Sequence, residues 1–104
     1  MRLSSKLRLA SDGRGNRTLL YYCEGCEEFH GVPIERDGKE GPLWTWDGEI
    51  HLPTISPSVN VRANGPRRCH HSITLGYIVY HGDTQHSLRS LTCELADLPG
   101  FSAP

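Results

Sequence analysis

The chain has 104 residues, the size of one domain, and 37% of them are hydrophobic. Its net charge of −1 lacks the basic excess that is usual in general nucleic-acid-binding proteins. No apolar run is long enough to cross a membrane, and the first residues lack the apolar core of a signal peptide. We therefore expect a cytoplasmic protein, where cysteines stay reduced and bind metal ions more often than they form disulfides.

The N-terminal part of the chain differs in charge from the part that follows. Residues 1–20 carry five bases and one acid, whereas residues 21–50 carry eight acids and two bases. The run at 11–16, Ser-Asp-Gly-Arg-Gly-Asn, has the composition of a loop. We expect residues 1–16 to form a flexible basic arm and residues 17–104 to form a single β-rich domain.

Strand-like segments follow one another from residue 17 onwards. Residues 17–22 and 29–34 have the composition of strands, and a tight turn with two cysteines separates them. Trp44 and Trp46 alternate onto one face of a further strand, where we expect core residues rather than a stacking surface. The prolines within 53–58 exclude a helix, and the next strand is predicted around residues 59–61.

The C-terminal half continues the same pattern. Residues 72–75 and 77–80 flank Gly76 as a bent pair or hairpin, and residues 91–95 are a candidate last strand. Residues 84–90 are the one place where we expect that a short helix could form. The sequence predicts a mainly β, small single-domain antiparallel fold with little or no helix.

The pair Cys23-x2-Cys26 is the clearest chemical signal. Two thiolates at this spacing on a turn between strands can face one ion, and zinc takes four nitrogen or sulfur ligands in a tetrahedron. We expect Cys69 and His86 to complete the set, because a hairpin brings its two ends together. The predicted fold is therefore built around a zinc site. Other downstream candidates are His70, His71, His81 and Cys93.

Two alternatives to this ligand set stay open. His70 competes with Cys69, since neighbouring strand residues point to opposite faces and only one of them can reach the ion. The Cys23–Cys26 pair could also be a redox site, but the acidic side chains of Glu24, Glu27 and Glu28 oppose a lowered thiol pKa.

A second group of polar residues lies outside the preferred zinc ligands. His30, His70 and Asp83, with His81 nearby in the sequence, could bind a second metal or carry out acid–base chemistry. The alternative is that these are surface histidines and a turn aspartate. No catalytic residue is assigned from the sequence, and the three residues remain candidates.

The order of short motifs resembles a small family of phage and prophage proteins of unknown function, sometimes labelled ammonia monooxygenase. The resemblance covers about residues 20–99. It implies a phage accessory protein with a zinc site and no known reaction, and the monooxygenase label conflicts with the lack of a membrane segment. The matching residues are Cys23, Cys26, His30, Trp44, Trp46, Gly48, Pro53, Thr54, Pro57, Ser58, Cys69, His70, Asp83 and His86.

These observations lead to three functional hypotheses. The first is a non-enzymatic zinc module that binds a host or phage protein. The second is a metal-dependent hydrolase or nuclease that uses His30, His70, Asp83 and His86. The third is a nucleic-acid-binding module that uses the arginines, which the near-neutral charge disfavours. No membrane partner is expected, and the oligomeric state is left open.

Overall fold

The computed structural model describes residues 1–38 and 41–100. Within these ranges the chain forms strands and no helix, which confirms the predicted mainly β antiparallel fold. The strands are β1 (Arg8–Ser11), β2 (Arg17–Cys23), β3 (Glu28–Glu35), β4 (Thr45–Trp46), β5 (Ile55–Val61), β6 (Cys69–Thr74), β7 (Tyr77–Tyr80) and β8 (Thr92–Glu94).

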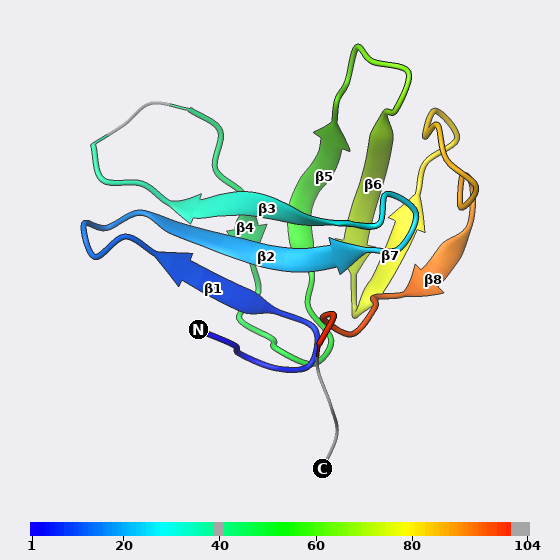
Figure 1. The fold of residues 1–104 in the computed structure, drawn as a ribbon. Coiled ribbons are helices and arrows are strands. Elements are labelled where there is room, and N and C mark those ends of the chain that lie inside the picture. Colours follow the sequence, from blue (N-terminus) through cyan, green and yellow to red (C-terminus); the bar gives the residue numbers. More distant parts are fainter. Residues whose placement is uncertain (39–40, 101–104) are drawn as a thin grey trace.

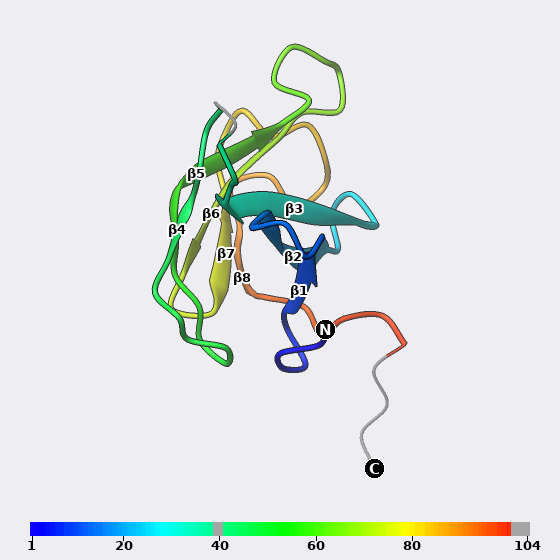
Figure 2. The same cartoon turned by 90° about the vertical axis from the view of Figure 1, so that its left-hand side faces the viewer.

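The strands form two antiparallel sheets. The first has the order β1-β2-β3 and the second has the order β4-β5-β6-β7-β8, so within each sheet strands adjacent in sequence are adjacent in space. The β1–β2, β2–β3 and β6–β7 connections are short turns, which suit antiparallel pairing. Figures 1 and 2 show the two sheets as two layers, with the strands of the first running across those of the second.

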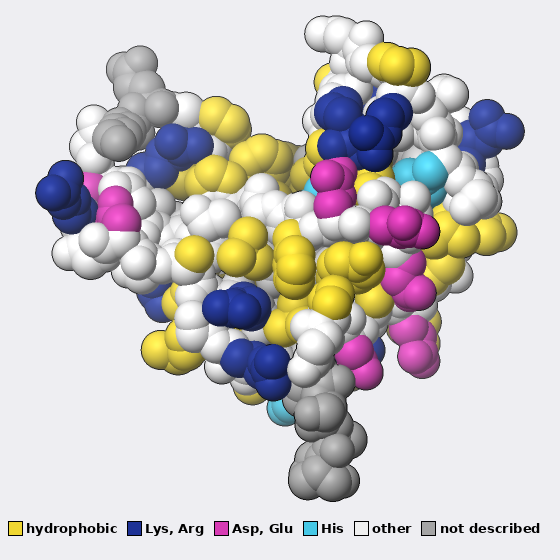
Figure 3. Space-filling model, in the orientation of Figure 1, with side chains coloured by type: hydrophobic (Ala, Val, Ile, Leu, Met, Phe, Trp, Pro, Cys, Tyr) yellow, Lys and Arg dark blue, Asp and Glu magenta, His cyan; other side chains and the backbone are white. Residues whose placement is uncertain are grey.

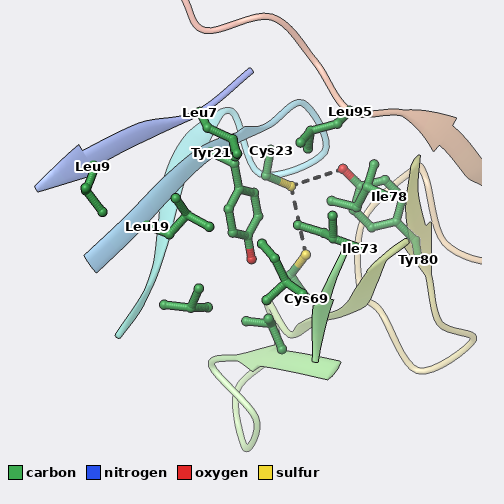
Figure 4. Close-up of a cluster of buried hydrophobic side chains, with 13 residues drawn as sticks. Leu7, Leu9, Leu19, Tyr21, Cys23, Cys69, Ile73, Ile78, Tyr80 and Leu95 are labelled. Carbon is green, nitrogen blue, oxygen red and sulfur yellow. Dashed lines mark hydrogen bonds between the residues drawn. The ribbon is translucent and has the colours of Figure 1, made fainter. Parts of the chain in front are cut away.

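The core lies between the two sheets and follows from the alternation of side chains along each strand. Along β2, Leu19, Tyr21 and Cys23 are buried, while their neighbours are half-buried. Along β6, Cys69 and Ile73 are buried on the facing side. Figure 4 shows these side chains converging from both sheets, with the sulfur of Cys23 directed towards the second sheet.

Residues before β2 also contribute to the core. Leu7 is fully buried and Leu9 is 7% exposed, and β1 pairs with β2 through registers such as Leu9 with Leu19. The expected division into a flexible arm, residues 1–16, and a domain, residues 17–104, stays a prediction. Strand β1 lies within the residues assigned to the arm.

The segment 84–90 forms successive turns, so the short helix considered there is absent. Arg89 N–H donates to His86 O and Leu91 N–H donates to Leu88 O, at 3.1 and 3.0 Å, which are bonds to the third residue back. Ser90 has a φ of 66°, outside the helical region. A segment this short forms few helical hydrogen bonds, and His86 within it contacts Cys69 Sγ at 3.3 Å. Among the described residues, no helix has the length and apolar character needed to span a membrane.

Candidate active site and metal centre

An irregularity in β5 places Ser58 on the outer face of the second sheet. Ile55 pairs with Ile73 and Val59 pairs with His71, so β5 advances four residues while β6 advances two. The extra residues include Pro57, which has no N–H to donate and follows a cis peptide bond. Bulges of this kind re-aim side chains and often occur beside active sites. Ser58 is half-buried as a result.

Ser58, His70 and Asp83 form a continuous chain of hydrogen bonds. Ser58 Oγ lies 3.1 Å from His70 Nε2, and His70 Nδ1 lies 2.9 Å from Asp83 Oδ1. An ionised Asp83 accepts the Nδ1–H proton, so Nε2 is left as an acceptor for the Ser58 hydroxyl. This is the arrangement of a nucleophile, a general base and an orienting carboxylate.

The surroundings of the three residues favour this protonation pattern. The hydrogen bond from His70 holds the pKa of the Asp83 carboxyl below its ordinary value, with a smaller effect from the nearby charge of Arg68. Arg68 Nη1 lies 3.4 Å from Asp83 Oδ2. The ring of His81 stacks on the His70 ring with centroids 4.2 Å apart, and its Nε2 lies 2.8 Å from Ser72 Oγ. The His70 ring is therefore held at its edge by hydrogen bonds and on one face by the ring of His81.

The opposite face of β6 carries a cysteine cluster. Cys23, Cys26, Cys69 and His86 place one ligand atom each within 4.8 Å of one another, so these residues could hold a metal ion. Cys23 Sγ lies 3.9 Å from Cys69 Sγ, and Cys69 Sγ lies 3.3 Å from His86 Nε2. Two sulfurs around a tetrahedral zinc lie roughly 3.8 Å apart, given Zn–S bonds of about 2.3 Å. The donor set and its spacing fit such an ion.

The thiols of the cluster are electrostatically coupled to one another. The hydrogen bond between Cys23 and Cys69 lowers the pKa of Cys23 and raises that of Cys69, because one proton is shared between them. Burial, and then the charge of Cys23, raise the pKa of Cys26. Tyr80 Oη lies 3.2 Å from Cys23 Sγ, as drawn in Figure 4. Arg62 Nη2 donates to Cys26 Sγ at 3.3 Å, which further offsets negative charge.

Gly25 leaves the space that the His86 ring occupies. A Cβ atom at this position would collide with the Cε1, Nδ1 and Nε2 atoms of His86. The residue immediately before Cys26 therefore has to be glycine for His86 to reach the sulfurs. This close approach is a steric requirement, independent of the sulfur chemistry.

A buried layer of aromatic and imidazole side chains lies behind the cluster. His71 is fully buried, with its Nε2 2.7 Å from Tyr21 Oη and its Nδ1 3.3 Å from Cys69 Sγ. Burial lowers the pKa of His71 to about 4, so it is a neutral ring that can donate from Nδ1 to the Cys69 sulfur. His30 stacks on it at 5.3 Å between centroids, and His30, Cys69 and His71 form a second group able to hold a metal.

The structure separates the residues that the sequence grouped together. His70 and Asp83 meet on the outer face, whereas His30 lies in the core beside His71. Cys69 lies in the cysteine cluster and His70 does not, as their alternation along β6 requires.

Sequence reasoning missed Ser58 as a candidate functional residue. Ser58 appeared in the sequence analysis only as part of a proline-containing motif. A catalytic serine has no fixed sequence distance from its histidine and aspartate partners. The available signal was that Ser58 occurs together with His70 and Asp83 among the ordered motifs of the resemblance. The bulge that joins them in space cannot be read from the sequence alone.

A groove lies next to the strand that carries Ser58. It has a volume of about 320 Å³ and lies against β4 and the end of β3. Trp44 reaches from the groove towards Ser58, because its Nε1 donates to Ser58 O at 3.3 Å. Figure 3 shows hydrophobic side chains in the hollow between the β3 end of the molecule and the β5–β6 turn. The residues that line the groove are Arg17, Ile34, Glu35, Trp44, Thr45 and Trp46.

Comparison with known proteins gives one family. No curated protein and no solved structure matches the chain. A family model described as "Bacterial ubiquitination-like system serine protease (BubE)" matches residues 2–81, which is most of the chain. The match supports a bacterial family and gives no support to a phage origin or to the monooxygenase label.

This match corrects the expected function. The prediction of a non-enzymatic phage accessory module is wrong, because the family is described as a protease. The sequence reasoning failed there because it treated the cysteines as the centre of the chemistry and left Ser58 without a role. The chain belongs to the family of bacterial ubiquitination-like system serine proteases.

Proposed function

We propose that the protein is a serine protease with Ser58 as the nucleophile, His70 as the general base and Asp83 as the orienting carboxylate. The observation that carries this proposal is the unbroken hydrogen-bond chain from Ser58 Oγ through His70 to Asp83, with distances of 3.1 and 2.9 Å. The description of the family names the same class of enzyme.

The geometry supports acyl transfer in two steps. Ser58 Oγ attacks the carbonyl carbon of the scissile bond while His70 Nε2 accepts the hydroxyl proton. The C–N bond then breaks and His70 gives this proton to the leaving amine, so that an ester on Ser58 remains. Water attacks the ester, its proton passes to His70 and then to Ser58 Oγ, and the carboxylic acid leaves. Asp83 stabilises the transient imidazolium throughout.

The family description supports a proposal for the substrate class. It places these proteases in bacterial ubiquitination-like systems, and we propose that the peptide bond cut by this chain belongs to a protein of such a system. The groove beside β4 is lined by Trp44, whose Nε1 donates to Ser58 O, and we propose that this groove takes an extended stretch of that substrate.

We propose that the metal ion of the cysteine cluster is zinc, held by Cys23, Cys26, Cys69 and His86. When bound, zinc would supply a cross-link that stabilises the fold, since four protein ligands leave no open position for water or substrate. The three thiols and one imidazole suit zinc better than they suit the oxygen-seeking cations magnesium and calcium. The ligands lie on the core side of β6, away from Ser58.

The test is hydrolysis of an activated ester, p-nitrophenyl acetate, and of unfolded casein by the wild-type chain and two serine variants. Ser58→Ala should abolish turnover. Ser56→Ala, an exposed serine two residues earlier on β5, should retain it. Equal turnover by wild type and Ser58→Ala would refute the nucleophile assignment.

A further inference from the structure

The backbone of His70 is bound by a side chain from the same turn that carries Asp83. Thr84 Oγ1 accepts a hydrogen bond from His70 N–H at 3.0 Å and donates one to His70 O at 2.7 Å. A single hydroxyl therefore satisfies both polar groups of the peptide units around His70. Thr84 is fully buried, so water cannot replace it without opening the turn.

The need for this hydroxyl arises from where β7 ends. His71 pairs with Tyr80, the last residue of β7, so the strand provides no further residue to pair with His70. Backbone groups left without hydrogen-bond partners reduce the stability of the fold. Partners for the His70 backbone therefore have to come from another part of the chain. His81 N–H donates to His70 O at 2.8 Å, and Thr84 provides the remaining contacts.

Residues 83–85 bind the start of β6 and the residue before it. Asp83 holds the His70 ring, Thr84 holds the His70 backbone, and Gln85 N–H donates to Arg68 O at 2.7 Å. Since Asp83 and Thr84 are adjacent, one short stretch of chain is hydrogen-bonded to both the ring and the backbone of His70. A shift of the backbone would change the reach of Nε2 to Ser58.

We propose that Thr84 is a positioning residue of the active site, whose hydroxyl fixes the His70 main chain so that the imidazole spans Ser58 and Asp83. This inference rests on the proposed protease function and adds a residue to it. Thr84 touches neither substrate nor the reacting atoms. Its effect should therefore appear in the rate of the chemical step and leave the binding of small reactants unchanged, because small misplacements of a base cost large factors in rate.

The experiment measures the reaction of Ser58 with a fluorophosphonate, which forms an O–P bond at Oγ and releases fluoride while His70 takes the hydroxyl proton. The variants are Thr84→Val, which keeps the shape and removes the hydroxyl, and Thr84→Ser, which keeps the hydroxyl. Thr74→Val, at an exposed position on β6, is the matched control. The maximal rate of labelling and the half-saturating probe concentration are determined for each chain.

The expected result is that Thr84→Val lowers the maximal labelling rate by about 10- to 100-fold with an unchanged half-saturating concentration. Thr84→Ser and Thr74→Val should stay within about threefold of wild type. If Thr84→Val does not fold, as judged by circular dichroism, Thr84→Ala replaces it, and the comparison of Ala with Ser again isolates the hydroxyl.

Two results would overturn the proposal. Labelling of a folded Thr84→Val or Thr84→Ala chain at the wild-type rate would show that the hydroxyl does not position His70. A slow Thr84→Ser chain would show that the methyl group, and hence packing, is what matters. Failure of the protease function itself looks different, since the wild-type chain would then not be labelled at Ser58 at all.

Discussion

At the scale of single residues, the functional chemistry divides between the two faces of one short strand. His70 and Cys69 are neighbours on β6, and alternation sends the first to the outer face and the second into the core. The outer face carries the hydrogen-bonded Ser58, His70 and Asp83, and the inner face carries the sulfur cluster. A substitution at either residue should therefore affect one kind of chemistry more directly than the other.

Asp83→Asn should lower the rate of acyl-enzyme formation by about 10³- to 10⁴-fold, the size of effect known for orienting carboxylates in other serine proteases. An amide can donate to His70 Nδ1, which would move the ring proton to Nε2 and remove the base. Stopped-flow kinetics of ester hydrolysis measure the effect. Asp97→Asn is the control, because Asp97 pairs with Lys6 away from the site. A fully active Asp83→Asn chain would remove Asp83 from the mechanism.

Gly25→Ala should abolish metal binding, because the added methyl group would occupy the place of the His86 ring. Elemental analysis of the purified chain gives the metal content directly. Gly65→Ala serves as the comparison, since a Cβ atom there would meet its nearest neighbour at an ordinary 3.5 Å. Metal retained at the wild-type level in Gly25→Ala would mean that His86 is not a ligand.

At the scale of elements, the strands were more accessible to sequence reasoning than the connections. The strand-like composition of 17–22 and 29–34 predicted β2 and β3 to within one residue at each end. The turns of 84–90 were open to a helical reading, because no periodicity distinguishes a short helix from turns held by tertiary contacts. β1 was not predicted, since Leu7 and Leu9 are too few to give a clear pattern among polar residues.

Leu7→Ala should destabilise the protein by about 2–5 kcal/mol, the usual cost of truncating a fully buried leucine. The expectation follows from the position of Leu7 beneath β1, between the sheets. Urea denaturation followed by tryptophan fluorescence measures the change. Leu43→Ala, at a residue 47% exposed, should change stability by less than about 0.5 kcal/mol. Similar stabilities for the two variants would indicate that the N-terminal residues are detached in solution.

At the scale of the whole molecule, the cysteine cluster joins the two sheets. Cys23 ends β2 in the first sheet, Cys69 begins β6 in the second, and His86 comes from the turn that follows β7. Removal of the metal by a strong chelator should therefore lower the unfolding temperature. A ligand at 100 times its Kd stabilises the folded state by about 2.7 kcal/mol, and this stabilisation is lost with the metal. Differential scanning calorimetry with and without chelator, followed by addition of zinc, measures this effect.

Cys93→Ser is the control for metal removal, because Cys93 lies outside the cluster and should leave the chelator effect intact. Cys69→Ser should lose the metal and the chelator effect together. An unfolding temperature that does not respond to chelator, in a chain purified without metal, would contradict a structural metal.

The whole-molecule arrangement also explains which parts of the site the sequence could predict. Cys23 and Cys26 are close in sequence, so their spacing alone predicted a ligand pair, and His86 was placed by the hairpin argument. Ser58 and His70 are brought together by a bulge in β5, which depends on long-range pairing with β6. Such a contact has no local signature. The role of Thr84 is likewise invisible until the end of β7 is known.

The measurement that tests the central claim most directly is intact-mass spectrometry of the chain after treatment with a fluorophosphonate, followed by peptide mapping. We expect one adduct per chain, on Ser58, formed in the wild-type and Ser56→Ala chains and absent from Ser58→Ala and from His70→Ala. An adduct on another residue, or an unmodified wild-type chain that is folded and carries its metal, would contradict the assignment of Ser58 as the nucleophile of a serine protease.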